Sequence, residues 1–265
     1  MKRSFVILSL LAMCTTGLFY ACKKDKPATD LPVLKLAPDK VSGKSGFPVS
    51  TVLSGAVQNG VQNFYISKTV NLRIDSSWGT NGVLTVTTIP AGQTSFDYTF
   101  DYTLQDDEVD KLVGFNYRIE DTKGKAAEKD LTVNTIASGA QIIASHPWKV
   151  TSKIWETDDP PSENIQDCEK DNIYNYHRDS TISLNYGPNG CLFDGFNIFT
   201  TWSLSEDEKT FTQSYYSIFD PSKVTTEVYT VKTLTKDKWV VEIALDLSDF
   251  GLSDHELFQY TYEPF

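Results

Sequence analysis

Few side chains in this 265-residue sequence are arranged for catalysis. Its three histidines, His146, His177 and His255, are scattered, and none pairs with a second histidine or an acid at a helical metal-binding spacing. No serine has the Gly-x-Ser-x-Gly context of a nucleophile elbow, and no glycine-rich phosphate loop occurs. We therefore expect a protein that is not an enzyme and that has no cofactor and no metal.

Acidic side chains gather in three clusters, Asp106–Asp110, Asp158–Asp159 and Glu206–Glu208. Paired carboxylates could act as the acid and base of a glycosidase, and a larger oxygen set could hold Ca²⁺. Each cluster falls at an expected turn or loop, however, and none has Asp-x-Asp-x-Asp spacing followed by glycine. The pattern favours solvated surface charge.

Aromatic side chains are the better candidates for a ligand site. Tyr174, Tyr176, Tyr186, Trp202 and Tyr215 lie on or beside neighbouring expected strands. If they point into an open barrel, they would line a cup for a small hydrophobic or glycan ligand. The alternative is a small barrel filled by its own side chains, and the sequence slightly favours it.

The first 21 residues have the pattern of a secretory signal. Lys2 and Arg3 precede an apolar run that is too short and too broken for a membrane span of ~20 residues. The small residue before Cys22 resembles the lipobox of bacterial lipoproteins, although Phe19 stands where that family usually has Leu, Val or Ile. The resemblance implies cleavage before Cys22 and lipid attachment to it. An ordinary signal peptide or an uncleaved anchor is the alternative, and either also places the chain outside the cytoplasm.

Charge and composition exclude some classes of partner. Removal of residues 1–21 takes away two cations and no acid, so the formal net charge moves from −11 to −13. This balance argues against nucleic acid, which needs a basic face, and against a polybasic membrane contact. Hydrophobic residues at 40% and aromatic residues at 12% are enough for packed cores, and the length suggests two domains.

Cysteine usage points to one covalent cross-link. Cys14 leaves with the signal and Cys22 is the expected lipid site, which leaves Cys168 and Cys191. An even pair in an oxidising compartment most simply forms a disulfide. A metal site or a catalytic thiol is the alternative, but no histidine lies at ligand spacing from either cysteine.

The region 33–136 has a β pattern throughout. Phe96, Tyr98, Phe100 and Tyr102 form a period-two aromatic row, and about seven short strands separated by turn residues indicate a β-sandwich. The stretch 115–125, followed by 129–133, resembles the last hairpin of bacterial immunoglobulin-like and PKD-like domains. In that hairpin Asp121 can cap the turn and Gly124 can adopt a left-handed conformation.

The region 147–265 stays β, with seven or eight strands in meander order that suggest an up-and-down barrel. It resembles the lipocalin-like domains of Gram-negative lipoproteins, although His146-Pro147 stands where that family tends to have glycine. The resemblance implies a barrel and a Cys168–Cys191 bridge without naming a ligand. The matching positions are Trp148, Cys168, Lys170, Asp171, Tyr174, Cys191, Trp202, Lys209 and Leu234.

Together these patterns predict an all-β protein with an N-terminal immunoglobulin-like β-sandwich and a C-terminal lipocalin-like β-barrel. We expect a lipid-anchored envelope lipoprotein of the outer membrane, on its periplasmic face or on the cell surface, that binds a small hydrophobic or glycan ligand. The alternative is a pocketless structural or interaction subunit of an envelope nutrient-uptake complex. The expected segments are a signal peptide (1–21), a lipid-anchored tether (22–32), the sandwich (33–136), a linker (137–146) and the barrel (147–265).

Overall fold

The computed structural model describes residues 30–265. The expected signal peptide, Cys22 and most of the tether lie outside the described residues. Within residues 30–265, no helix has both the length and the apolar character needed to cross a membrane.

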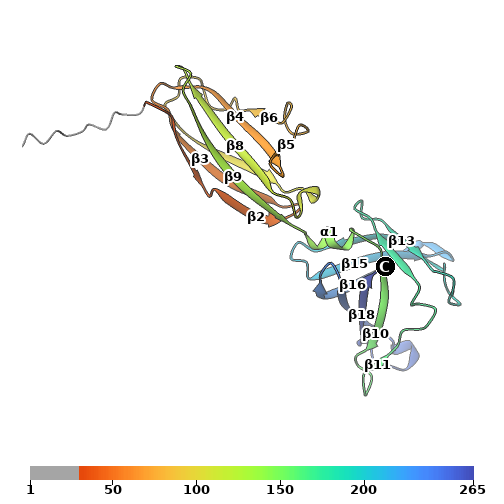
Figure 1. Cartoon of the computed structure of the whole chain (residues 1–265). Coiled ribbons are helices and arrows are strands. Elements are labelled where there is room, and N and C mark those ends of the chain that lie inside the picture. Colours follow the sequence, from red (N-terminus) through yellow and green to blue (C-terminus); the bar gives the residue numbers. More distant parts are fainter. Residues whose placement is uncertain (1–29) are drawn as a thin grey trace, which may run out of the picture.

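Two sheets face each other in the N-terminal part of the chain (Figure 1). The first has the order β1-β3-β7, from β1 (Val33–Ala37), β3 (Pro48–Ala56) and β7 (Ser95–Thr103). The second has the order β2-β9-β8-β4-β5, with β6 beside β4, from β2 (Lys40–Lys44), β4 (Val61–Val70), β5 (Arg73–Ile74), β6 (Val83–Thr85), β8 (Val113–Asp121) and β9 (Ala126–Ile136). All pairings are antiparallel except β2 with β9.

The core of this sandwich comes from alternate residues of its strands. Phe96 and Phe100 of β7 are buried against Phe64 and Phe115 of the opposite sheet. This arrangement agrees with the period-two aromatic row. The Asp121 carboxylate accepts hydrogen bonds from the backbone N–H groups of residues 123 and 125, and Gly124 has φ 76°, so the turn chemistry of the last hairpin is as predicted.

A short helix, α1 (Gly139–Ile143), follows β9. Ser138 caps it, since its Oγ accepts the Gln141 backbone N–H at 3.2 Å. Ile143 is fully buried in the C-terminal core, and its carbonyl accepts the Trp148 Nε1–H at 2.8 Å. The segment expected as a linker is therefore packed onto the barrel at this helix.

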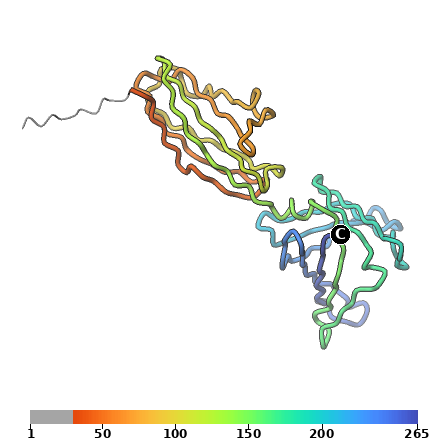
Figure 2. The backbone as a smooth tube through the Cα atoms, viewed as in Figure 1, coloured from red at the N-terminus to blue at the C-terminus, as the bar shows by residue number. Residues whose placement is uncertain are grey.

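The C-terminal part forms one nine-stranded antiparallel sheet that nearly closes on itself (Figures 1 and 2). Neighbours in the sheet follow the chain, and the last strand pairs with the first, which gives the predicted up-and-down order. A bridge between Thr181 and Thr201 joins the two remaining edges. The strands are β10 (Trp148–Trp155), β11 (Ser162–Glu163), β12 (Ile173–Tyr176), β13 (Ile182–Asn185), β14 (Asn197–Leu204), β15 (Thr210–Ser217), β16 (Asp220–Leu234), β17 (Trp239–Leu245) and β18 (Glu256–Pro264).

Up-and-down order sends alternate turns to opposite ends of the barrel. The end that faces the sandwich consists of turns 177–181, 205–209 and 235–238. Ion pairs join each of these turns to the sandwich. Segments 156–172, 186–196, 218–219 and 246–255 lie at the other end, called the distal end below. The end that faces the sandwich is therefore part of the contact between the two parts of the chain, whereas the distal end is not.

Candidate functional site

The sandwich-facing half of the barrel is filled by aromatic side chains. The Trp239 ring centroid lies 4.6 Å from that of Tyr262, 4.7 Å from Phe211 and 5.7 Å from Trp148. Tyr176 completes the cluster at 5.6 Å from Phe211. All five side chains are nearly or fully buried, so this half leaves no room for a ligand.

A polar network lies between this core and the distal half. Gln213 Nε2 donates to Glu227 Oε2 at 2.8 Å and to the Tyr229 hydroxyl at 3.0 Å, and that hydroxyl donates to Glu227 at 2.7 Å. Gln213 Oε1 accepts from the Tyr176 hydroxyl at 3.3 Å. Burial raises the pKa of Tyr176 and of Tyr229 well above the ordinary value, so both phenols keep their protons.

A cavity of about 470 Å³ opens at the distal end. Its volume lies within the usual range of small-molecule sites, roughly 300–1,000 Å³. Its lining is of mixed character. The apolar and aromatic residues are Tyr174, Leu184, Tyr186, Cys191, Leu192, Phe193 and Phe199. The polar residues are Gln166, Glu169, Asn172, Asp194 and Asn197.

Tyr174 forms the inner wall of this cavity. Strand β12 places it two residues before Tyr176, so both face inward, and their rings stack at 6.4 Å. Its ring also makes edge contacts with Tyr262 and Phe199. Burial raises the pKa of Tyr174 above its ordinary range, and the hydroxyl is therefore a neutral hydrogen-bonding group.

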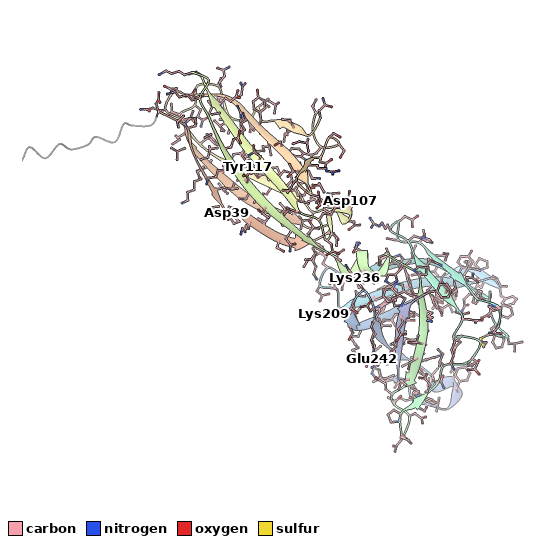
Figure 3. All side chains as sticks on the ribbon, in the orientation of Figure 1. Asp39, Asp107, Tyr117, Lys209, Lys236 and Glu242 are labelled. Carbon is pink, nitrogen blue, oxygen red and sulfur yellow. A yellow bond between two sulfur atoms is a disulfide. The ribbon has the colours of Figure 1, made fainter. Side chains whose placement is uncertain are left out.

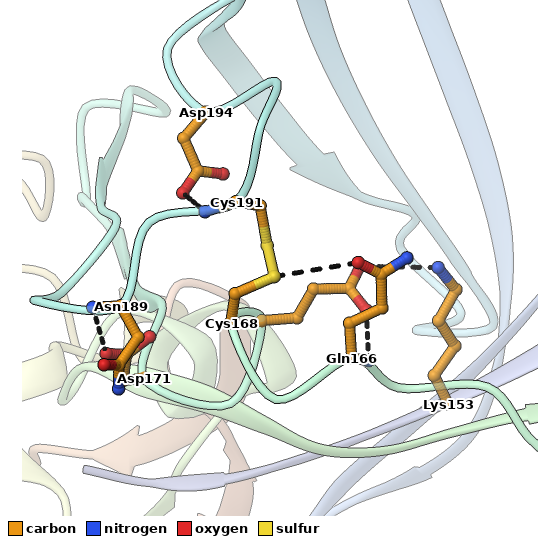
Figure 4. The surroundings of a disulfide bond; sticks show 8 residues. Lys153, Gln166, Cys168, Asp171, Asn189, Cys191 and Asp194 are labelled. Atoms are coloured by element: carbon orange, nitrogen blue, oxygen red, sulfur yellow. Dashed lines mark hydrogen bonds and ion pairs between the residues drawn. A yellow bond between two sulfur atoms is a disulfide. The ribbon is translucent and has the colours of Figure 1, made fainter.

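A disulfide holds the outer wall (Figure 4). Cys168 and Cys191 are bonded, with their Cα atoms 5.3 Å apart, as the cysteine count predicted. Asp194 Oδ2 accepts the Cys191 backbone N–H at 2.6 Å, and Asp171 Oδ2 accepts that of Asn189 at 3.0 Å. The disulfide and the Asp171–Asn189 bond tie segment 186–196 to segment 156–172, whereas the Asp194–Cys191 bond lies within segment 186–196, and both segments line the cavity.

Asn172 is the most unusual polar group of the lining. The residue is only 5% exposed, and among residues 30–265 its Oδ1 has no hydrogen-bond partner. Leaving such a buried group unpaired costs about 1–3 kcal/mol. Functional sites are one place where such a cost is retained.

Apolar side chains continue outward from the cavity and form a patch that we call the apolar rim: Leu192, Phe193, Phe196, Ile218 and Phe219. Phe193 and Phe219 are 70% and 74% exposed. Their rings lie 5.7 Å and 5.1 Å from that of Phe196, which stands between them. A gathered set of exposed aromatic rings is typical of an interaction surface.

The five sequence-predicted ligand residues divide between the two halves of the barrel. Tyr174 and Tyr186 line the cavity, and Tyr215 is outside the lining, with its ring centroid 5.3 Å from that of the lining residue Phe199. Tyr176 and Trp202 belong to the filled core, at 3% and 6% exposure. Sequence reasoning missed Asn172, Phe193 and Phe199. The signal for Asn172 was its place between the matched Asp171 and Tyr174.

Figure 3 shows the side chains on the ribbon, with Asp107 of one acidic cluster on the sandwich and Lys236 on the barrel. Residues 30–265 contain no group of three or more His, Cys, Asp or Glu side chains that could hold a metal ion. The His146 ring packs at a tilt against that of Trp148, with 4.3 Å between centroids, and His177 hydrogen-bonds Ser183. Both histidines therefore have structural neighbours.

A second cavity, of about 390 Å³, lies between the sandwich and the barrel. Most of its charged lining is paired, because Asp106 contacts Arg178 at 2.8 Å and Glu208 contacts Lys44 at 2.6 Å, and only Glu206 makes no ion pair among residues 30–265. Trp202 reaches this cavity from the core. Its surroundings fit a domain junction better than a ligand site.

Comparisons with known proteins give no family. No family model matches the chain, and no curated protein matches it. A DUF4466 family protein from Parabacteroides merdae is a solved structure with TM-score 0.34 and 10% identity, over 89% of this chain and 99% of that one. The sporulation control protein Spo0M from Bacillus subtilis has TM-score 0.29 and 8% identity, over 88% and 89%. A CARDB domain with di-metal ions from Pyrococcus furiosus has TM-score 0.23 and 11% identity, over 40% and 96%.

Proposed function

We propose that this chain is a lipid-anchored envelope lipoprotein that binds a small hydrophobic or glycan ligand, without catalysis, at the distal end of its barrel. The observation that supports ligand binding is the cavity of about 470 Å³ above a filled aromatic core. A small up-and-down barrel fills its interior with side chains by default. Here only the sandwich-facing half is filled.

Thermal unfolding of the purified chain tests the binding function. A ligand that binds the native state raises the midpoint in a dose-dependent way. We expect a shift with at least one member of a panel of fatty acids, haem-like compounds and oligosaccharides. The shift should be lost in Tyr186→Ala, which alters the cavity wall. It should persist in Tyr216→Ala, the outward-facing neighbour of Tyr215 on β15.

The anchor is supported by the lipobox-like pattern that ends at Cys22. In bacterial cells grown with labelled palmitate, the wild-type chain is expected to incorporate label and to fractionate with the outer membrane. Cys22→Ser should do neither, because it lacks the thiol that would carry the lipid. Equal labelling of Cys22→Ser and wild type would contradict lipid attachment at this residue.

A second candidate function is that of an interaction subunit in an envelope nutrient-uptake complex. The apolar rim favours it, because clustered exposed aromatic side chains are common at protein interfaces. A ligand panel that produces no shift, in a chain whose disulfide is intact, would favour this second function over the first.

A further inference from the structure

We propose that the distal cavity takes the end of a neutral glycan, and that the glycan chain continues across the apolar rim. This inference rests on the proposed binding function and names the class of ligand. Three features of the site carry it: the hydrogen-bonding groups of the wall, their charge, and the aromatic surface that leads out of the cavity.

The wall offers hydrogen-bonding groups suited to hydroxyls. Amides come from Gln166, Asn172 and Asn197, and a phenol comes from Tyr174. Asn172 belongs to this wall, and its Oδ1 is shielded from solvent without a partner among the described residues, so a ligand donor would satisfy it only where the lining shifts to expose it. A sugar carries several hydroxyls, each of which both donates and accepts, whereas the alkyl chain of a fatty acid carries none.

The charge of the wall disfavours anions. Two of its twelve lining residues are acids, Glu169 and Asp194, and none is Lys or Arg. Lys153 is not among the lining residues, and its Nζ lies 3.4 Å from Oε1 of the lining residue Glu169 and over the Tyr260 ring. It is therefore already engaged. A carboxylate or phosphate would enter next to Asp194 without a free cation to meet it, and a neutral ligand has no such penalty.

Aromatic rings lead from the cavity to the surface. Phe193 lines the cavity and is also the first ring of the rim, which continues through Phe196 to Phe219. Aromatic faces bury the apolar C–H faces of sugar rings while the hydroxyls at the ring edges stay in water. A row of such rings beyond the cavity suits a chain-shaped ligand with one end inside.

Calorimetric titration of the full chain tests this with defined probes. The neutral probes are maltohexaose, cellohexaose, xylohexaose and mannohexaose, the anionic sugar is hexagalacturonate, and the lipid is oleate. We expect one neutral hexamer to bind, with a Kd that barely changes between low and high salt because no charge is paired. Its disaccharide should bind more weakly, because it cannot reach the rim. Hexagalacturonate and oleate should not bind.

Variants locate the binding. Phe193→Ala should weaken binding of the hexamer by roughly three- to tenfold through the lost stacking. Phe265→Ala is the matched control, because Phe265 is 71% exposed against 70% for Phe193 but follows β18 at the sandwich-facing end. It should leave the Kd unchanged. Asn172→Ala should weaken the hexamer and the disaccharide alike. Since Phe193 is a surface residue, its variant remains informative even if Asn172→Ala fails to fold.

The outcomes separate the two proposals. Binding of oleate or hexagalacturonate that Phe193→Ala weakens would overturn the neutral-glycan inference and leave the proposed binding function standing. Binding of a neutral hexamer that ignores both Phe193→Ala and Asn172→Ala would place the glycan elsewhere and also overturn the inference. No binding by any probe, together with no thermal shift across the wider panel, would overturn both.

Discussion

At the level of single residues, Glu156 and Glu242 on the outer face of the barrel have pKa values that are shifted in opposite directions. The Lys232 ammonium, 2.9 Å from Glu242, holds the pKa of Glu242 low. Burial and the neighbouring Glu242 raise the pKa of Glu156. A carboxyl whose pKa is higher in the folded than in the unfolded state favours folding at low pH. That contribution is lost as the pH rises through the folded value.

Glu156→Gln is therefore expected to raise the unfolding midpoint at pH 7 and to have little effect below about pH 4, where the unfolded carboxyl is also protonated. Thermal unfolding from pH 3.5 to 8 measures the difference. Because the chain is acidic overall, Glu263→Gln on β18 serves as a control for the loss of one negative charge. An equal rise in the unfolding midpoint from both substitutions would mean that the Glu156–Glu242 pair has no special role.

The same scale shows where sequence reasoning reaches its limit. The two-residue spacing along β12 puts Tyr174 and Tyr176 on one face of the strand, and their rings stack. It cannot predict depth along the barrel axis, which decides that Tyr176 is packed by Phe211 and Trp239 while Tyr174 borders a cavity. The burial of Asn172 depends on segment 186–196, and no local pattern records it.

At the level of elements, the Cys168–Cys191 bridge joins the two irregular segments that form the outer wall of the cavity. Replacing both cysteines by serine frees a loop of 23 residues and should lower the free energy of unfolding by about 3 kcal/mol in the chain-entropy model. Urea unfolding with and without a reductant measures this. Reductant should destabilise the wild type and leave the double variant unchanged. A lower free energy of unfolding for both proteins would mean that the reductant acts on a group other than this disulfide.

A buried ion network anchors the short 3₁₀ helix η1 (Asp106–Glu108) in the sandwich. Lys68 Nζ lies 2.6 Å from Glu108 and 2.8 Å from Asp75, and the side chains of Lys68 and Glu108 are 7% and 2% exposed. Lys68→Met leaves the Glu108 charge buried without its cation, so a loss of about 3–5 kcal/mol in unfolding free energy is expected in urea. Adding Glu108→Gln removes that charge and should recover part of the loss. No recovery would show that packing, rather than charge, dominates.

At the level of the whole molecule, the alternating strand patterns and the turn residues predicted an all-β chain with a meander of strands in its C-terminal part. These sequence patterns could not predict which distant segments pair with each other. The parallel contact of β2 with β9 and the closure of β18 on β10 join residues far apart in the sequence. Such pairings depend on the packing of the complete core rather than on local propensity. For the same reason the sequence could not indicate which end of the barrel faces the sandwich.

Ion pairs join the sandwich to the barrel, and the side chains in these pairs differ in their exposure to solvent. Arg178–Asp106 and Lys236–Asp110 are largely solvent-exposed ion pairs, and such pairs contribute little and are screened by salt. Glu208 is better placed. Its side chain is 20% exposed, and it accepts hydrogen bonds from Lys44 Nζ at 2.6 Å and from the Gly139 backbone N–H at 2.8 Å. One carboxylate thereby binds the sandwich, the first turn of α1 and the barrel together.

Glu208→Ala should therefore loosen the junction where the loss of an exposed pair would not. Small-angle scattering of the purified chain is expected to show a larger maximum dimension and a broader distance distribution for this variant at low salt. Glu206→Ala, in the same turn, should match the wild type. High salt should move the wild type only part of the way toward Glu208→Ala, because the Gly139 hydrogen bond sits in the more buried part of the junction. Identical profiles for both variants and the wild type at every salt concentration would mean that the apolar packing of α1, whose Ile143 is buried in the same core as Leu204 and Leu234, holds the two parts together without help from charge.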